Sequence, residues 1–85
     1  NTYPNPFSTV IYLATEVKTK SEKMAVTLID MSGRIVFGKD LGDVGPGTQV
    51  FRLDIGSRPM PPGIYLLRVT SGNVPVKTIK LIKKQ

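Results

Sequence analysis

The segment from Pro61 to Thr70 constrains the fold of this chain most strongly, because two prolines and a glycine lead directly into a run of β-favouring residues. Successive side chains of a strand point to opposite faces, so the segment has two different faces. One face carries Tyr65, Leu67 and Val69. The other carries Ile64, Leu66 and Arg68. The apolar first face predicts a central strand that lies against the core. The second face turns polar at Arg68, so we expect it to be covered only next to Gly63.

Further strands are predicted wherever short apolar alternations lie between turn signals. They span residues 8–14, 24–30, 35–37, 49–55 and 74–85, the last with 76–82 as its paired part. The residues expected to face inward are Met24, Val26, Leu28, Phe51, Leu53 and Ile55. The polar stretches 15–23 and 39–48 are predicted to be a loop and a turn. Pro75 cannot donate to a strand ladder, so it belongs at the start of the last strand or on an edge.

About six or seven short strands without a convincing helix predict an all-β fold, an immunoglobulin-like antiparallel β-sandwich, with a small barrel as the alternative. A chain of 85 residues has room for one domain. We therefore expect residues 1–85 to form a single domain. Within it, residues 1–7 form an extended lead-in segment, since Pro4 and Pro6 exclude a helix there. The chain begins at Asn1 rather than Met, so we expect it to belong to a longer precursor.

The stretch from Asp30 to Arg34 predicts a tight hairpin turn. The Asp30 carboxylate can accept hydrogen bonds from the turn backbone, and Gly33 can adopt a positive φ without steric cost. The alternative is a cation site that combines Asp30 with Asp40 or Asp43. Two or three scattered carboxylates lack the dense oxygen-ligand loop that such a site needs, so the structural interpretation is favoured and no metal is expected.

The net charge of +6 is confined to the C-terminal third, because residues 1–54 contain six basic and six acidic residues. The later basic residues are Arg58, Arg68, Lys77, Lys80, Lys83 and Lys84, with no acid among them. This polarity suggests an acidic or anionic partner. The alternative is that lysines protect an edge strand from aggregation. No nucleic-acid partner is expected, since the only aromatic residue beyond Asp54 is Tyr65, which is assigned to the core.

The composition argues against catalysis. The chain has no histidine and no cysteine, so serine nucleophiles lack their usual base and neither disulfides nor thiolate metal sites can form. The six acids are scattered, and the glycines between Gly42 and Gly47 carry no phosphate-binding lysine. No apolar run approaches the ~20 residues of a membrane span, so no membrane insertion is expected. We therefore expect no enzyme activity and no cofactor.

Three stretches together carry a family resemblance. They are Tyr3–Phe7 (YPNPF), Asp30–Arg34 (DMSGR) and Gly63–Tyr65 (GIY), the last followed by a lysine-rich strand. In this order and at these separations, the chain resembles the C-terminal sorting domain (type A) of the type IX secretion system of Bacteroidota. The resemblance covers the whole chain. One departure is the proline-rich stretch 59–62, where members usually carry fewer prolines.

The resemblance implies an immunoglobulin-like signal domain at the end of a cargo protein. Such a domain directs folded cargo from the periplasm across the outer membrane to the cell surface or medium. A sortase then removes it, and the cargo is commonly anchored to lipopolysaccharide. The implied partners are the outer-membrane translocon, a shuttle protein and the sortase, together with the upstream cargo in the same precursor.

The resemblance also implies roles for particular residues. The recognition motif would comprise Gly63 and Tyr65 with the basic element Lys77, Lys80, Lys83 and Lys84. The domain-start motif would be Pro4, Asn5 and Pro6, and the hairpin motif Asp30, Gly33 and Arg34. A structural role is the alternative for two of them: Gly63 would let the chain turn into the strand, and Tyr65 would fill the core with its hydroxyl reaching a partner. The competing function is a surface-displayed immunoglobulin-like or fibronectin-like module for adhesion or glycan binding.

Overall fold

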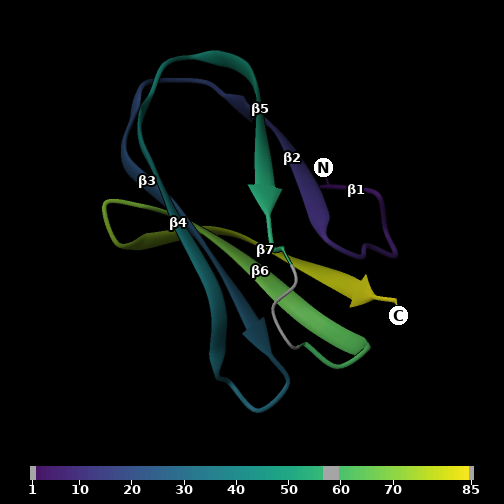
Figure 1. Ribbon diagram of the computed structural model, residues 1–85. Helices are drawn as coiled ribbons and strands as arrows, with labels where there is room; N and C mark the ends of the chain where they lie inside the picture. The colour runs from purple at the N-terminus through teal and green to yellow at the C-terminus, as the bar shows by residue number, and fades with distance from the viewer. Residues whose placement is uncertain (1, 57–59, 85) are drawn as a thin grey trace.

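The chain forms two antiparallel sheets that pack face to face (Figure 1). The computed structural model describes residues 2–56 and 60–84. Its strands are β1 (Thr2–Tyr3), β2 (Val10–Val17), β3 (Ser21–Asp30), β4 (Ile35–Val44), β5 (Gly47–Asp54), β6 (Gly63–Ser71) and β7 (Val74–Lys83). One sheet has the order β1-β2-β5 and the other β4-β3-β6-β7. The predicted all-β, immunoglobulin-like sandwich is confirmed.

The core lies between the two sheets and draws apolar residues from both. Its fully buried members include Ile11, Leu13 and Leu53 from the smaller sheet, and Leu28, Leu67 and Leu81 from the larger one. Each of these comes from one face of its strand, as the two-residue period requires. The alternation read from the sequence therefore identified the inward face correctly.

Strand β6 is central, as predicted, because β3 and β7 pair with its two edges. On its core face Tyr65 is 4% exposed and Leu67 is fully buried. On the opposite face Ile64 is 39% exposed, so the expectation that this face is covered next to Gly63 is wrong. The reason is that the neighbouring strands extend the same outer face of the sheet and place no second layer over it.

The predicted loop at 15–23 and turn at 39–48 are largely strand. Strand β2 continues to Val17, which pairs with Gly47, and β4 continues to Val44, which pairs with Ser21. Val17 and Val44 are both buried and extend the core to this end of the sandwich. The polar residues of these two stretches point outward or lie at β-bulges, so the composition of the stretches resembles that of a loop. Such strand ends can be identified only when the strand that pairs with them is known.

Strand β7 lies at the edge of the larger sheet. Pro75 is its second residue, next to an irregularity in the β6–β7 register between Val69 and Thr70, which agrees with the predicted position. The described residues form no helix long and apolar enough to cross a membrane.

Candidate recognition surface

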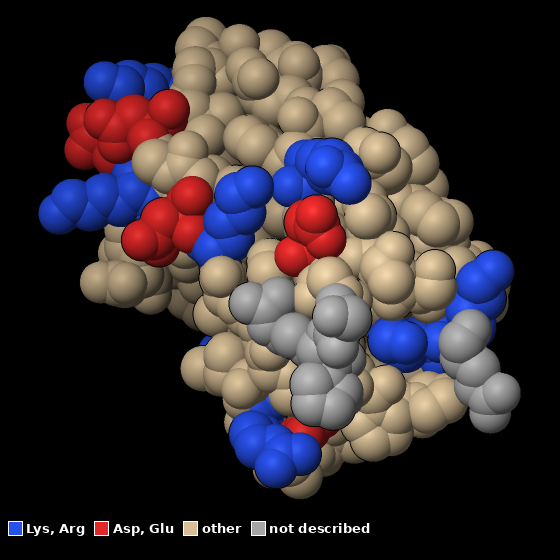
Figure 2. Space-filling model, viewed as in Figure 1, with Lys and Arg blue, Asp and Glu red and all other residues tan. Residues whose placement is uncertain are grey.

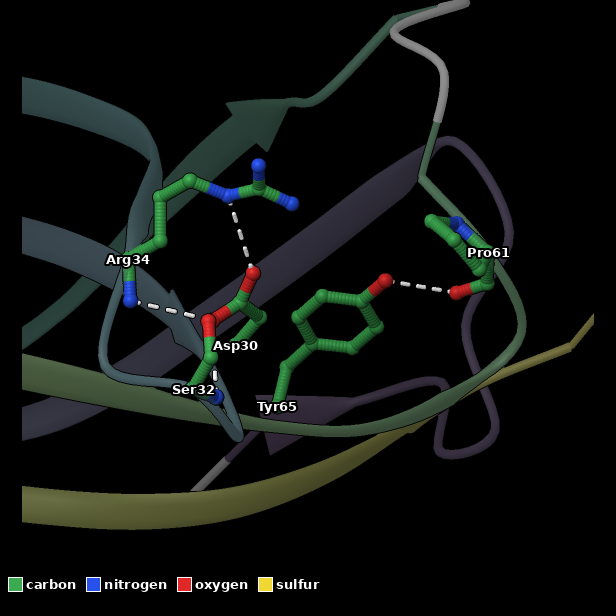
Figure 3. Close-up of polar contacts among 5 residues, drawn as sticks. All are labelled: Asp30, Ser32, Arg34, Pro61 and Tyr65. Carbon is green, nitrogen blue, oxygen red and sulfur yellow. Dashed lines mark hydrogen bonds and ion pairs between the residues drawn. The ribbon is translucent and has the colours of Figure 1, made fainter.

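The hairpin motif is a turn organised by the Asp30 carboxylate (Figure 3). Its Oδ1 accepts hydrogen bonds from the backbone N–H groups of Ser32 and Arg34, both at 3.0 Å, and from the Ser32 hydroxyl at 2.7 Å. Its Oδ2 lies 3.2 Å from Nε of Arg34. Gly33 has a φ of +89°, in the left-handed region that favours glycine. The turn therefore uses Asp30 and Gly33 as the sequence predicted.

These donors also stabilise the charged form of the carboxyl group. The Ser32 hydroxyl and the Arg34 backbone N–H contribute most, and they lower the pKa of Asp30 from 3.8 to about 2. Asp43, a possible partner in a cation site, instead accepts a hydrogen bond from the Lys23 backbone at 3.1 Å. In residues 2–56 and 60–84, no group of three or more His, Cys, Asp or Glu side chains is placed to hold a metal ion.

Tyr65 combines a buried ring with a hydrogen-bonded hydroxyl. The ring packs edge-on against Phe7, with 6.3 Å between the ring centroids, and the hydroxyl donates to the Pro61 carbonyl at 2.5 Å (Figure 3). Burial raises the pKa of Tyr65, and the nearby Asp30 carboxylate adds to the rise. The structural role is confirmed: Tyr65 fills the core and attaches the loop before β6 to the sheet.

Gly63 begins β6 with a φ of +147°, a conformation that residues with a side chain rarely adopt. No heavy atom lies within 4 Å of the position that a Cβ would occupy. The requirement for glycine is therefore conformational rather than steric. The glycine lets the loop that contains Pro61 and Pro62 turn into the strand.

The hairpin turn and the loop before β6 lie side by side at one end of the sandwich. They line an open hollow formed by Asp30, Met31, Ser32, Arg34, Pro61, Pro62, Gly63, Ile64 and Tyr65. Two motifs that are about thirty residues apart in the sequence thus form one surface. Sequence reasoning missed Met31, which is 68% exposed at this hollow. An apolar residue inside a polar turn is the signal that could have identified it.

The domain-start motif lies against the end of β7. Oδ1 of Asn5 accepts a hydrogen bond from the Ile82 backbone N–H at 3.0 Å. The Phe7 N–H donates to the Ile82 carbonyl and the Lys84 N–H donates to the Phe7 carbonyl, both at 2.9 Å. The peptide bonds before Pro4 and Pro6 are cis. The lead-in segment is thus paired with the C-terminal strand, and Lys83 of that strand is opposite Gly63.

The lysines of the recognition motif are spread along β7 and just beyond it. Lys77, Lys80 and Lys84 are exposed, whereas Lys83 is half-buried and its Nζ donates to the Lys84 carbonyl at 2.9 Å. The ion pairs within the described residues are Arg34–Asp30 and Arg52–Asp54, so none of these four lysines is ion-paired. Figure 2 shows basic side chains beside the C-terminal end without an acidic neighbour, whereas both signs mix at the upper left. Arg58 lies outside the described residues.

A comparison with known protein families gives a match over almost the entire chain. The sequence model of the family described as secretion system C-terminal sorting domain matches residues 1–84. No curated protein matches the chain significantly. The matched region includes all three motifs and the lysine-rich strand.

Proposed function

The chain belongs to the family of secretion system C-terminal sorting domains, and on that premise we propose that it directs an upstream cargo protein through the type IX secretion system and is then removed by a sortase. Domains of this family are sorting signals, in general non-catalytic, that lead to export across the outer membrane to the cell surface or beyond. The chain then interacts with the secretion machinery as a folded sorting signal and not as an enzyme.

The observation that carries this proposal is the family match over almost the entire chain. It is supported by the way the fold assembles the motifs. The hairpin turn lies beside Tyr65 and Gly63, and the domain-start motif lies against the lysine-rich strand that pairs with Gly63. A machine that reads this end of the folded domain would meet the hairpin turn, Gly63 and the start motif together, whereas Lys77 lies farther along β7, opposite Val69.

We further propose that residues 1–85 act as one signal domain whose lead-in segment connects to the cargo. During transit through the periplasm, the domain would be read by the outer-membrane translocon, with a shuttle protein and the sortase acting afterwards. The recognition surface would consist of the hollow next to Gly63 and the lysines of β7, which form no ion pair within the described residues. Three residues would position that surface through their contacts within the fold and would not touch the receptor themselves: Asp30, Tyr65 and Asn5.

A fusion tests the proposal directly. Residues 1–85 are attached to the C-terminus of a fluorescent protein that carries a periplasmic targeting signal, in a host with the type IX system. The fusion is expected at the cell surface or in the medium, whereas the unfused reporter stays in the periplasm. A matched host that lacks the translocon should retain both proteins. Periplasmic retention of the fusion in the competent host would contradict the sorting function and favour a displayed adhesion or glycan-binding module.

A further inference from the structure

The outer edge of β7 is only partly paired. Its inner edge pairs with β6 from Gly63 to Ser71, with one register irregularity between Val69 and Thr70. On the outer side, Ile82 and Lys84 bond to Asn5 and Phe7 of the lead-in segment. In the described ranges 2–56 and 60–84, no strand pairs with this outer edge before Ile82. An unpaired strand edge is a template for another extended chain.

The hydrogen bonds of Ile82 indicate which backbone groups of β7 point outward along this edge. Its N–H and carbonyl both point away from β6, because they bond to Asn5 and Phe7. In an antiparallel ladder every second residue directs its N–H and carbonyl to the same side. Thr78 and Lys80 therefore present their backbone donors and acceptors outward, in the same row as Ile82.

Both ends of the free edge are defined. Toward the start of β7, the register irregularity opposite Thr70 and the missing N–H of Pro75 interrupt the ladder. Toward its end, the lead-in segment occupies the edge at Ile82. The open window is Val76–Lys80, about the length of a typical short strand.

The side chains around this window select the charge of an incoming strand. Lys77 and Lys80 are exposed and form no ion pair with another described residue, and the window contains no acid. A second copy of this chain would bring further lysines to the same edge, which is unfavourable. The outer strand of the same sheet, β4, carries Asp40 and Asp43 as well as Lys39, so its charge is mixed. The edge of β7 is thus suited to an acidic strand from a different protein.

We propose that the outer edge of β7 from Val76 to Lys80 is a strand-addition site for an extended acidic segment of a protein of the secretion machinery. Backbone hydrogen bonds to Thr78 and Lys80 hold the segment, and its carboxylates face Lys77 and Lys80. These two lysines are three positions apart and on opposite faces of the sheet. The partner strand therefore carries two acidic residues three positions apart. The identity of the partner rests on the proposed sorting function, whereas the site itself rests on the edge.

The site is tested on purified residues 1–85 with a synthetic probe, the heptapeptide TEVTEVT, and a matched TKVTKVT peptide. Amide exchange and chemical-shift changes are followed by NMR. We expect the Thr78 and Lys80 amides to exchange rapidly in the free domain and at least tenfold more slowly with the acidic peptide. The lysine peptide is expected to bind at least tenfold more weakly. Protection of both amides in the free monomer, equal binding of the two peptides, or self-association through β7 in sedimentation would overturn the proposal.

Two variants separate the backbone from the charge. Thr78→Pro removes an outward N–H without breaking the β6–β7 ladder, so it should weaken binding of the acidic peptide at least tenfold while the domain stays folded. Lys77→Glu with Lys80→Glu changes no backbone group and should reverse the peptide preference. The control, Lys39→Gln with Arg52→Gln, alters β4 at the opposite edge of the larger sheet and β5 of the other sheet, and should bind as wild type. Unchanged binding by the two test variants would overturn the proposal.

Export of the fluorescent fusion distinguishes this inference from the proposed function. If the wild-type fusion is exported and a folded Thr78→Pro fusion is exported equally well, strand addition by the machinery is wrong and the sorting function stands. If the wild-type fusion is retained, the sorting function fails and so does the assignment of the partner to the machinery. The peptide experiment then still decides whether the edge accepts an acidic strand.

Discussion

Asn5 and Ile82 are 77 positions apart in the sequence, yet Oδ1 of Asn5 accepts the backbone N–H of Ile82 at 3.0 Å. This contact joins the first motif of the chain to its last strand. Together with the two bonds of Phe7 to Ile82 and Lys84, it makes the lead-in segment part of the folded domain. We therefore expect the start motif and β7 to unfold together.

Asn5→Ala should destabilise the domain by about 0.5–1.5 kcal/mol, because it removes the acceptor for the Ile82 N–H. Asn5→Asp keeps an acceptor oxygen at the same position and should recover most of the loss. Denaturant unfolding measured by circular dichroism gives both values. A stability of Asn5→Ala equal to that of wild type would show that solvent replaces the contact at no cost.

Leu67→Ala should cost about 2–5 kcal/mol, because Leu67 is fully buried on the core face of β6. Ile64→Ala is the matched control from the outer face of the same strand, where the side chain is 39% exposed, and should cost much less. Both values come from equilibrium unfolding in urea. A loss below about 0.5 kcal/mol for Leu67→Ala would contradict the assignment of the core face.

Tyr65→Phe keeps the buried ring and removes only the hydroxyl that donates to the Pro61 carbonyl. We expect a loss of about 0.5–1.5 kcal/mol in unfolding free energy. Amide exchange should also become faster at Met60 and Gly63, the residues on either side of Pro61 and Pro62, since the attachment of this loop to the sheet is lost. Exchange rates identical to those of wild type would show that other contacts hold the loop.

The lowered pKa of Asp30 predicts an acid-dependent loss of stability. The pKa of this carboxyl group is about 2 in the folded domain, against an ordinary value of 3.8, so the group binds protons more readily when the chain is unfolded. Its contribution is therefore complete above pH 4 and declines as the pH falls toward 2. The melting temperature of wild type should fall more steeply over this range than that of Asp30→Asn. Parallel curves for the two proteins would contradict the assigned pKa.

Replacing Lys80, Lys83 and Lys84 with Gln should separate stability from export. None of the three forms an ion pair within residues 2–56 and 60–84, so the melting temperature should stay within a few degrees, given that ~1 kcal/mol shifts a domain of this size by about 4–8 °C. Export of the fluorescent fusion should fall, because a receptor that reads the basic strand loses its charge partner. Lys18, Lys20 and Lys23 replaced with Gln provide the control with equal charge. If the β7 variant folds and is exported at the wild-type rate, these lysines serve only to protect the edge strand.

Local chemistry in the sequence determined the strands and their inward faces. The alternation at Tyr65, Leu67 and Val69 and the turn chemistry of Asp30 and Gly33 both act within a few residues, so they could be read without a structure. The same local reading failed at residues 15–17 and 21–23, on either side of a correctly predicted loop at 18–20, and at residues 39–44. There the strands are stabilised by partners from other segments, and their own polar residues resemble those of a loop.

Only the tertiary structure decided which segments meet. Periodicity states that a residue faces inward but carries no information on the strand that lies opposite, because pairing depends on contacts between distant positions. The hairpin turn therefore could not be placed beside Gly63 from the sequence, nor could Asn5 be placed against Ile82. The free edge from Val76 to Lys80 is likewise a result of the tertiary structure. Strand β7 is the last strand of its sheet, and the lead-in segment pairs only with the C-terminal end of β7.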